Sequence, residues 1–545
     1  MNTIFTKNRF SIFSILILGI GGLAACKKNK SDDVATTTTT TGVPSTGSRK
    51  ELTLDSLFLY AKQIYFWNDA LPEYSTFNPR QYSSKAVDLD NYDDELYAIS
   101  QLKLNPATGK PYEYYGDGFP KYSYIEDITT ANPNATSSVN GKANVDTEGN
   151  GYDIGIRPVY YLVRNSNAYY LFITAVYPGS PAAAAGVQRG WVITKVNGTS
   201  IGTNYSTERS SVSTALDAAS VKIEGYNYVD KVPFSLTLNR ASYKSSPVYA
   251  SKVILRSGKK IGYLAFARFS ALTNQDAPSD ANLDPVFSNF STQGITDLVV
   301  DLRYNGGGYI QTAEYLANLI APSGTTGKKM YTEIYNTALQ ANPKTTIMVN
   351  QPLLTSAGKV QFQDGKMVTY ADIDYSQAGN TTNFTKKGTL NSVTNVVFIV
   401  SGSTASASEL LINSLKPYMT VQLVGDTTYG KPVGFFPITL EHRYDVYMSL
   451  FETRNANNEG GYYTGMVPGT FVDDNSQYPF GDEREQDLSA ALNLIAPGSV
   501  SSQSATSSVK DRSSQVSSFS YSGVKPANPQ SEFVGMIEKK HKLKK

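Results

Sequence analysis

The chain has 545 residues, which is more than a single hydrophobic core normally organises, so we expect two or three domains. Its 49 lysines and arginines nearly balance its 47 aspartates and glutamates, which leaves no electrostatic sign of nucleic-acid binding, and we set that class aside. The single cysteine excludes an intrachain disulfide and a metal site built from several cysteines.

The N-terminus has the composition of a secretory signal peptide, which we assign to residues 1–25. Basic residues precede the apolar stretch 10–25, which is too short and too interrupted by serine and glycine for a membrane span. The stretch ends in Leu-Ala-Ala-Cys at 23–26, which resembles a bacterial lipobox. We therefore expect lipidation of Cys26, with an ordinary signal peptide and an incidental cysteine as the alternative.

Residues 26–50 contain a run of six threonines at 36–41 and few apolar side chains. Such a segment cannot bury a core, so we predict a flexible tether after the lipidated cysteine. The membrane is then a partner through the N-terminal lipid. We expect the chain in the cell envelope, anchored in the outer membrane at its periplasmic face or at the cell surface.

Residues 51–150 begin with an apolar pattern that predicts an amphipathic helix. Its apolar positions are Leu52, Leu54, Leu57, Phe58, Ala61, Ile64 and Tyr65. Loops rich in proline and tyrosine follow, and the polar stretch 129–151 is typical of a linker. We therefore predict a small helical N-terminal domain over 51–150.

Residues 151–245 show the short apolar runs and glycine turns of a β domain. Ser180 opens a short alanine-rich helix, and the pair Asn197-Gly198 predicts a tight hairpin. On these features the segment 172–198 resembles a PDZ domain of the kind that accompanies bacterial proteases. Trp191 departs from the pattern, because that family usually has an aspartate there.

A PDZ domain would present a peptide-binding loop beside a strand edge that pairs with the peptide backbone. The resemblance places this loop at Tyr152, Asp153, Ile154, Gly155 and Ile156. Backbone N–H groups of the loop would hold the terminal carboxylate of a peptide. The alternative is a core β-turn without a ligand. Under the first interpretation, the partners are proteins or peptides with free C-termini.

From residue 250 to 497, strands and helices alternate, which predicts a mainly parallel sheet with helical crossovers. Three apolar segments are the clearest strands, at 295–302, 396–400 and 421–424. The turns after these strands contain, in order, Gly307 with Gly308, Ser406 and Lys431. Ligands bind beyond the carboxyl ends of parallel strands, so we expect all three turns at one edge of the sheet.

Ser406 lies in the run Ser-Thr-Ala-Ser-Ala-Ser-Glu at 403–409, where small residues open a helix and expose its hydroxyl. A serine nucleophile needs a base, and the chain has only His442 and His541, the latter in a lysine-rich tail. Lys431 is the better base, because desolvation lowers the pKa of a buried lysine. The alternative for Ser406 is a structural helix cap, since Ser-x-x-Glu is also a capping box.

Four motifs together resemble the C-terminal processing peptidase, or tail-specific protease, family, which with the PDZ domain covers roughly residues 150–495. They are Gly-Tyr-Leu at 262–264, Asp-Leu-Arg-Tyr-Asn-Gly-Gly-Gly at 301–308, Thr-Ala-Ser-Ala-Ser-Glu at 404–409 and Gly-Asp-Thr-Thr-Tyr-Gly-Lys at 425–431. The resemblance implies that Ser406 is the nucleophile and Lys431 its base. It implies an oxyanion hole of backbone N–H groups from Ala407 and from Gly307 or Gly308, with no metal and no cofactor.

These motifs are also compatible with other functions. The glycines at 306–308 suit a phosphate-binding turn, but neither a G-x-G-x-x-G pattern nor a Walker lysine accompanies them. Asp301 and Arg303 are interpreted as structural charges. Phe435 stands where many family members have a glutamine that orients the lysine. A peptide-binding or scaffold lipoprotein with a degenerate site is therefore the alternative to a serine endopeptidase.

Residues 498–545 are rich in serine and then in lysine, and we predict a disordered, low-complexity tail. The whole sequence predicts a multidomain α+β protein with a helical N-terminal domain, a PDZ-like β domain and an α/β peptidase domain. Its expected activity is that of a lipid-anchored serine endopeptidase acting on proteins or peptides that it recognises by their C-terminal tails.

Overall fold

The computed structural model describes residues 42–129 except 117, residues 145–497 except 164, 356 and 357, and residues 535–538, 541, 543 and 544. The predicted signal peptide, Cys26 and the threonine run lie outside these residues. Within them, no helix combines the length and the apolar composition that crossing a bilayer requires. Pro44–Lys545 form one unit by their internal contacts.

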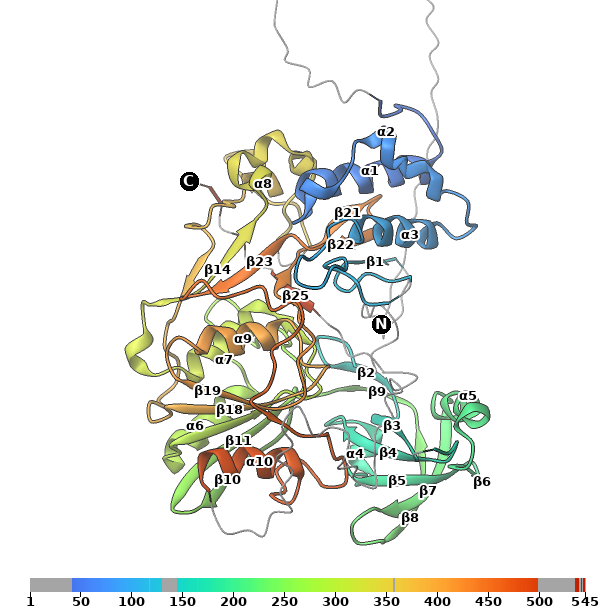
Figure 1. Ribbon diagram of the computed structural model, residues 1–545, viewed down its shortest axis with the longest axis vertical. Coiled ribbons are helices and arrows are strands. Elements are labelled where there is room, and N and C mark those ends of the chain that lie inside the picture. Colours follow the sequence, from blue (N-terminus) through green and yellow to red (C-terminus); the bar gives the residue numbers. More distant parts are fainter. Residues whose placement is uncertain are drawn as a thin grey trace, which may run out of the picture. The chain divides into compact units, whose positions relative to one another are not determined.

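The N-terminal helical region packs directly onto the peptidase region (Figure 1). Helix α1 (Arg49–Ile64) begins at Ser48, which forms a capping box with Glu51, and it buries most of its predicted apolar positions. Helix α3 (Asp88–Ser100) packs against α1. Strand β1 (Tyr124–Asp127) pairs antiparallel with β22 (Tyr444–Tyr447). The predicted N-terminal domain is thus helical, but its last strand completes a sheet of the peptidase region.

The PDZ-like domain is an antiparallel sheet with the order β3-β4-β5-β7-β8, and β6 pairs with β5. Its strands are β3 (Ile156–Leu162), β4 (Tyr169–Val176), β5 (Trp191–Val196), β6 (Thr199–Ser200), β7 (Ser220–Asn227) and β8 (Pro233–Asn239). Its helices are α4 (Pro181–Ala184) and α5 (Tyr205–Leu216). The Ser180 hydroxyl accepts the Ala183 N–H, so α4 begins where the sequence predicts. Strand β3 is an edge strand of this sheet.

The peptidase region is built on a sheet with the order β10-β11-β12-β18-β19-β24. Its strands are β10 (Val248–Arg256), β11 (Lys259–Phe266), β12 (Asp297–Asp301), β18 (Asn395–Val400), β19 (Thr420–Gly425) and β24 (Thr470–Phe471). The β10–β11 hairpin is antiparallel, and the neighbours from β11 to β24 are parallel. The predicted fold class is confirmed.

Both faces of this sheet are buried, which explains why the middle residues of its central strands β12 and β18 are apolar. One face packs against α6 (Leu283–Gln293), α7 (Ile310–Ile320) and α9 (Ala407–Leu415). The other face packs against α10 (Gln486–Ile495). The loops after β12, β18 and β19 therefore emerge at one edge, as the strand order requires.

Smaller elements complete this region. A four-stranded sheet has the order β17-β14-β23-β20, and a three-stranded sheet has the order β1-β22-β21. Their remaining strands are β14 (Lys329–Tyr335), β17 (Thr381–Asn383), β20 (Val433–Gly434), β21 (Ile438–Leu440) and β23 (Phe451–Asn455). Two further sheets have two antiparallel strands each: β2 (Asn150–Asp153) pairs with β9 (Ala241–Lys244), on either side of the PDZ-like domain in the chain, and β15 (Phe362–Gln363) forms a hairpin with β16 (Lys366–Met367). The short helices are α2 (Tyr74–Phe77) and α8 (Thr337–Ala341).

The C-terminus differs from the predicted disordered tail. Strand β25 (Gly535–Ile537) pairs in parallel with β13 (Gly307–Tyr309), and Met536 is fully buried. Residues 498–534 lie outside the described part of the chain. The segment that forms β25 is too short to show a strand pattern in the sequence. It forms a strand because it pairs with β13, more than 200 positions earlier in the chain.

Candidate active site

Ser406 lies at the turn between β18 and helix α9, where it is the N-cap residue. Its backbone has φ 61° and ψ −111°, a conformation that costs a non-glycine residue about 1–3 kcal/mol and is concentrated at functional sites. The side chain is fully buried, and its Oγ has no hydrogen-bond partner among the described residues. A strained turn therefore holds an uncommitted hydroxyl next to the free N–H groups of a helix.

Lys431 follows β19 and is also fully buried. Its Nζ donates a hydrogen bond of 3.3 Å to the Tyr122 carbonyl and lies 4.1 Å from the centroid of the Phe435 ring. Burial lowers the pKa of Lys431 to about 7, against the opposing charges of Glu113 and Glu409. Near neutral pH, a large fraction of this amine is therefore uncharged and can accept a proton.

The Glu409 carboxylate joins the two turns. Its Oε2 accepts the N–H groups of Ser406 and Lys431, each at 2.8 Å. Its Oε1 accepts the Gly430 N–H at 2.8 Å and the Thr428 hydroxyl. The cap interpretation of Ser-x-x-Glu is thus compatible with a site, because the same carboxylate also holds the lysine turn. The sequence predicts only a capping role for Glu409, because no local pattern signals its contact with the Lys431 turn.

The glycine run lies against the nucleophile. Gly307 and Gly308 have φ of 109° and 135°, which L side chains rarely adopt. A Cβ on Gly307 would lie 3.0 Å from both the Ser406 Cβ and the Ala407 nitrogen. Only a glycine therefore permits this approach.

The two predicted glycine donors differ in their hydrogen bonds. The Gly307 N–H donates to the Asn305 side chain at 2.9 Å. The Gly307 carbonyl and the Tyr309 N–H both bond to the Phe269 backbone at 2.8 Å. Because successive N–H groups of a strand point in opposite directions, the Gly308 N–H lies on the side away from Phe269, toward β25. Gly308 is thus better placed than Gly307 as a donor.

The N-terminal region contributes the wall of the lysine site. In addition to the carbonyl that accepts from Lys431, Tyr122 donates its hydroxyl to the Gly430 carbonyl. The buried Glu113 holds this segment, because it accepts the Tyr122 N–H at 3.1 Å and the Tyr65 hydroxyl at 2.8 Å. Phe435 replaces the glutamine that was expected to orient the lysine. A hydrogen bond to Tyr122, about 300 positions earlier in the chain, helps to orient Lys431 instead.

Comparison with known proteins agrees with this geometry. The family model of Peptidase family S41 matches residues 260–468, and the model of the PDZ domain matches residues 172–221. The chain carries an S41 peptidase domain. This is a family of serine-type peptidases, and the predicted relationship to C-terminal processing peptidases is confirmed.

The curated relatives of this chain are distant. The carboxyl-terminal-processing protease of Synechocystis sp. is 25% identical over 291 residues, which are 53% of this chain and 55% of the relative. A probable CtpA-like serine protease of Staphylococcus aureus is 24% identical over 314 residues, 56% of this chain and 50% of the relative. The chain therefore spans about half the length of these relatives.

One solved structure shares the fold more extensively. The crystal structure of an S41 protease candidate from Bacteroides fragilis is 22% identical and has a TM-score of 0.51. The similarity covers 81% of this chain and 96% of that chain. This similarity shows that the two chains share a fold.

A buried ionic cluster lies beside the S41 site. Arg303 makes ion pairs of 2.6 to 2.9 Å with Asp301, Asp474, Glu485 and Asp487. Among the described residues, the last three form the only acidic group close enough to share a metal ion. The Arg303 guanidinium already supplies positive charge there, in keeping with the structural role that we predicted for Asp301 and Arg303.

The predicted peptide-binding loop of the PDZ domain is tightly packed. Ile154 and Ile156 are buried, whereas Tyr152 is exposed. The Gly155 N–H donates to Asp153 Oδ1 at 2.6 Å. Gly155 has φ 84°, and a Cβ there would collide with Ser180. The loop thus packs on the start of α4, while the adjoining β3 supplies the predicted strand edge.

The histidines lie apart from the Ser406 turn. His442 is exposed in the turn between β21 and β22. His541 is half-buried and packs against the rings of Tyr370 and Phe436, with centroids 5.3 and 5.0 Å away, and desolvation lowers its pKa to about 4. Lys431, in contrast, lies in the turn that Glu409 joins to the Ser406 turn.

Proposed function

We propose that this protein is a serine endopeptidase in which Ser406 is the nucleophile and Lys431 the general base. The observation that carries the proposal is the buried Lys431, with its pKa near 7, in a turn that Glu409 ties to the Ser406 turn. A surface lysine would stay protonated and could not serve as a base. Burial supplies the neutral amine that this chemistry needs.

The proposed reaction uses the chemistry of these two side chains, whose turns are joined by Glu409. Neutral Lys431 takes the proton from Ser406 Oγ, and the oxygen attacks the substrate carbonyl. The N–H groups of Gly308 and Ala407 stabilise the resulting oxyanion, aided by the N-terminus of α9. The protonated lysine then gives its proton to the leaving amine, and a water molecule hydrolyses the acyl-serine.

A serine-reactive fluorophosphonate probe tests this proposal. It should label the wild-type protein and not Ser406→Ala, and cleavage of an unfolded protein should be lost in the same variant. Ser403→Ala is the matched control, because this exposed serine lies three positions earlier in the same run. Labelling of Ser406→Ala, or cleavage by it, would contradict the assignment.

The second candidate is a peptide-binding scaffold with a degenerate site. The observation in its favour is Phe435 in the position where many relatives have a lysine-orienting glutamine. Here the Phe435 ring packs on Lys431 Nζ while the Tyr122 carbonyl accepts its hydrogen bond. These contacts can position the amine without a glutamine, so Phe435 by itself does not favour the scaffold over the peptidase. An unlabelled and inactive wild-type protein would favour the scaffold.

Substrate selection by C-terminal tails is the next part of the proposal. The edge strand β3 lies beside the 152–156 loop, and an extended peptide can add to such an edge. Amidation of an apolar substrate tail should then weaken binding by roughly ten- to a hundredfold, as expected for loss of hydrogen bonds to a carboxylate. Equal cleavage of free, amidated and aspartate-ended tails would show selection elsewhere.

We also propose anchoring in the cell envelope through lipidated Cys26, on the outer membrane. The support is the lipobox-like end of the N-terminal apolar stretch. Cys26→Ser should move the protein out of the membrane fraction, or leave its signal peptide uncleaved, without changing activity in detergent. A wild-type protein found wholly in the soluble fraction would contradict this anchor.

A further inference from the structure

The C-terminal strand β25 lies on the glycine run of the site. Its register aligns Gly535 with Gly307 and Met536 with Gly308, and the Gly535 N–H donates to the Gly306 carbonyl at 3.1 Å. Strand β25 occupies the side of β13 that faces away from Phe269. This is also the side on which the Gly308 N–H, the proposed oxyanion donor, lies.

The other edge of β25 is paired as well. The Phe435 N–H donates to the Met536 carbonyl, and the Glu538 N–H donates to the Phe435 carbonyl, each at 3.1 Å. The Met536 side chain is fully buried in the core of the peptidase region. The tail is therefore held by backbone bonds on both sides and by one apolar anchor, which is how an extended peptide is recognised.

A carbonyl of this tail lies beside the nucleophile. The position that a Gly307 Cβ would occupy is 2.3 Å from the Gly535 oxygen and 3.0 Å from the Ser406 Cβ. The same position is 3.0 Å from the Ala407 nitrogen. A substrate carbonyl attacked by Ser406 would have to enter this same space.

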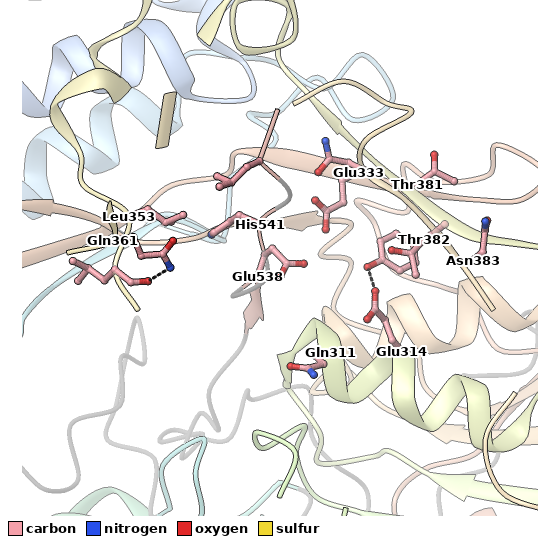
Figure 2. A pocket seen from close by; sticks show the side chains of 14 residues that line it. Gln311, Glu314, Glu333, Leu353, Gln361, Thr381, Thr382, Asn383, Glu538 and His541 are labelled. Carbon is pink, nitrogen blue, oxygen red and sulfur yellow. Dashed lines mark hydrogen bonds between the residues drawn. The ribbon is translucent and has the colours of Figure 1, made fainter. Parts of the chain in front are cut away.

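The tail continues along the peptidase region after β25. Leu543 forms a β-bridge with Ile373, and the Lys544 N–H donates to the Asp372 carbonyl at 2.8 Å. Glu538, His541 and Leu543 line a cavity of about 650 Å3, together with residues of α7 and β14. Figure 2 shows Glu538 and His541 in this cavity, with Glu314 and Glu333 around it. The contacts of the tail therefore extend beyond β25.

We propose that the C-terminal segment from Gly535 onward is a built-in competitor that occupies the substrate groove of this peptidase. The proposal rests on the proposed function of Ser406 and identifies the groove as the space between β13 and Phe435. It also predicts the substrate class: an extended segment with a small residue at the attacked carbonyl, followed by an apolar residue. Substrate enters when the tail leaves.

A binding experiment tests occupancy without requiring catalysis. A fluorescent peptide with the sequence of residues 531–545 is titrated into two Ser406→Ala proteins, one of full length and one ending at residue 530. The truncated protein should bind the peptide with micromolar affinity. The full-length protein should bind at least about tenfold more weakly, because its own tail is present at an effective concentration in the millimolar range. Equal binding to both proteins, or binding to neither, would overturn the proposal.

A second pair of variants keeps the chain at full length. Met536→Asp places a charge in the apolar site and should release the tail, whereas Met536→Leu should retain it. In the Ser406→Ala background, Met536→Asp should bind the peptide as the truncated protein does, and Met536→Leu should not. With Ser406 intact, Met536→Asp should raise kcat/KM at least about tenfold over Met536→Leu. Identical peptide binding by the two would overturn the proposal, whereas loss of activity in both, with the binding difference intact, would contradict only the proposed catalysis.

Discussion

Replacement of Lys431 by methionine should abolish catalysis and, at neutral pH, stabilise the fold. Burial lowers the pKa of this lysine from 10.5 to about 7, so folding at pH 7 requires the loss of a proton that the unfolded chain keeps. That difference corresponds to roughly 4 kcal/mol at pH 7, at about 1.4 kcal/mol per pKa unit. Methionine has a similar length and carries no charge.

The gain in folding stability is reduced because the substitution removes one hydrogen bond. The Tyr122 carbonyl accepts from Lys431 Nζ, and leaving this buried group without that donor costs about 1–3 kcal/mol. The variant should therefore be more stable than the parent by roughly 1–3 kcal/mol at pH 7. Stability and activity are opposed at this position.

The pH dependence gives a sharper test. Between pH 7 and pH 10.5 the unfolded chain binds more protons at this site than the native chain, so the stability of the parent rises with pH. The advantage of methionine should shrink by about 1.4 kcal/mol per pH unit and reverse between about pH 8 and pH 10. Urea unfolding of Ser406→Ala with and without Lys431→Met, at pH 7, 8.5 and 10, measures this difference. A methionine variant that is less stable at pH 7, or a difference that is independent of pH, would refute the reasoning.

Three further predictions concern the same site. The kcat/KM of the wild type should fall about tenfold per pH unit below an apparent pKa of about 7, because Lys431 must be neutral to act as the base. A kcat/KM that is constant from about pH 5 to about pH 9 would contradict this prediction. Glu409→Gln places an amide N–H against backbone donors that now bind a carboxylate. Therefore kcat should fall roughly a hundredfold, and the melting temperature, measured by thermal denaturation, should drop. Unchanged values would show that the Glu409 connection between the Ser406 and Lys431 turns is dispensable. Gly308→Ala places a Cβ 2.2 Å from the Phe269 oxygen at φ 135°, so activity should fall at least about a hundredfold. Gly324→Ala is the control, because a Cβ there enters open space, and its activity should stay within about twofold of the wild type. Similar activities of the two alanine variants would contradict the close approach.

Much of the site could be predicted from local sequence. The apolar strands and the turns that follow them are visible in the pattern, and parallel topology brings their carboxyl ends to one edge. Ser406, Lys431 and the glycine run therefore come together by a rule that needs no side-chain detail. The amphipathic spacing likewise predicted α1, and small residues with Asn-Gly predicted the helix and hairpin of the PDZ domain.

The tertiary structure decided how these turns are joined and what surrounds them. Glu409 satisfies the local rule for a helix cap, so its bonds to the Lys431 turn appear only when β18 and β19 are adjacent. Tyr122 supplies the lysine acceptor from 309 positions away, and β25 reaches the glycine run from a short segment without a periodic pattern. Local patterns indicate which backbone conformation a segment adopts and which of its faces is buried. Contacts between distant segments depend on the complete packing, which no single stretch of sequence contains.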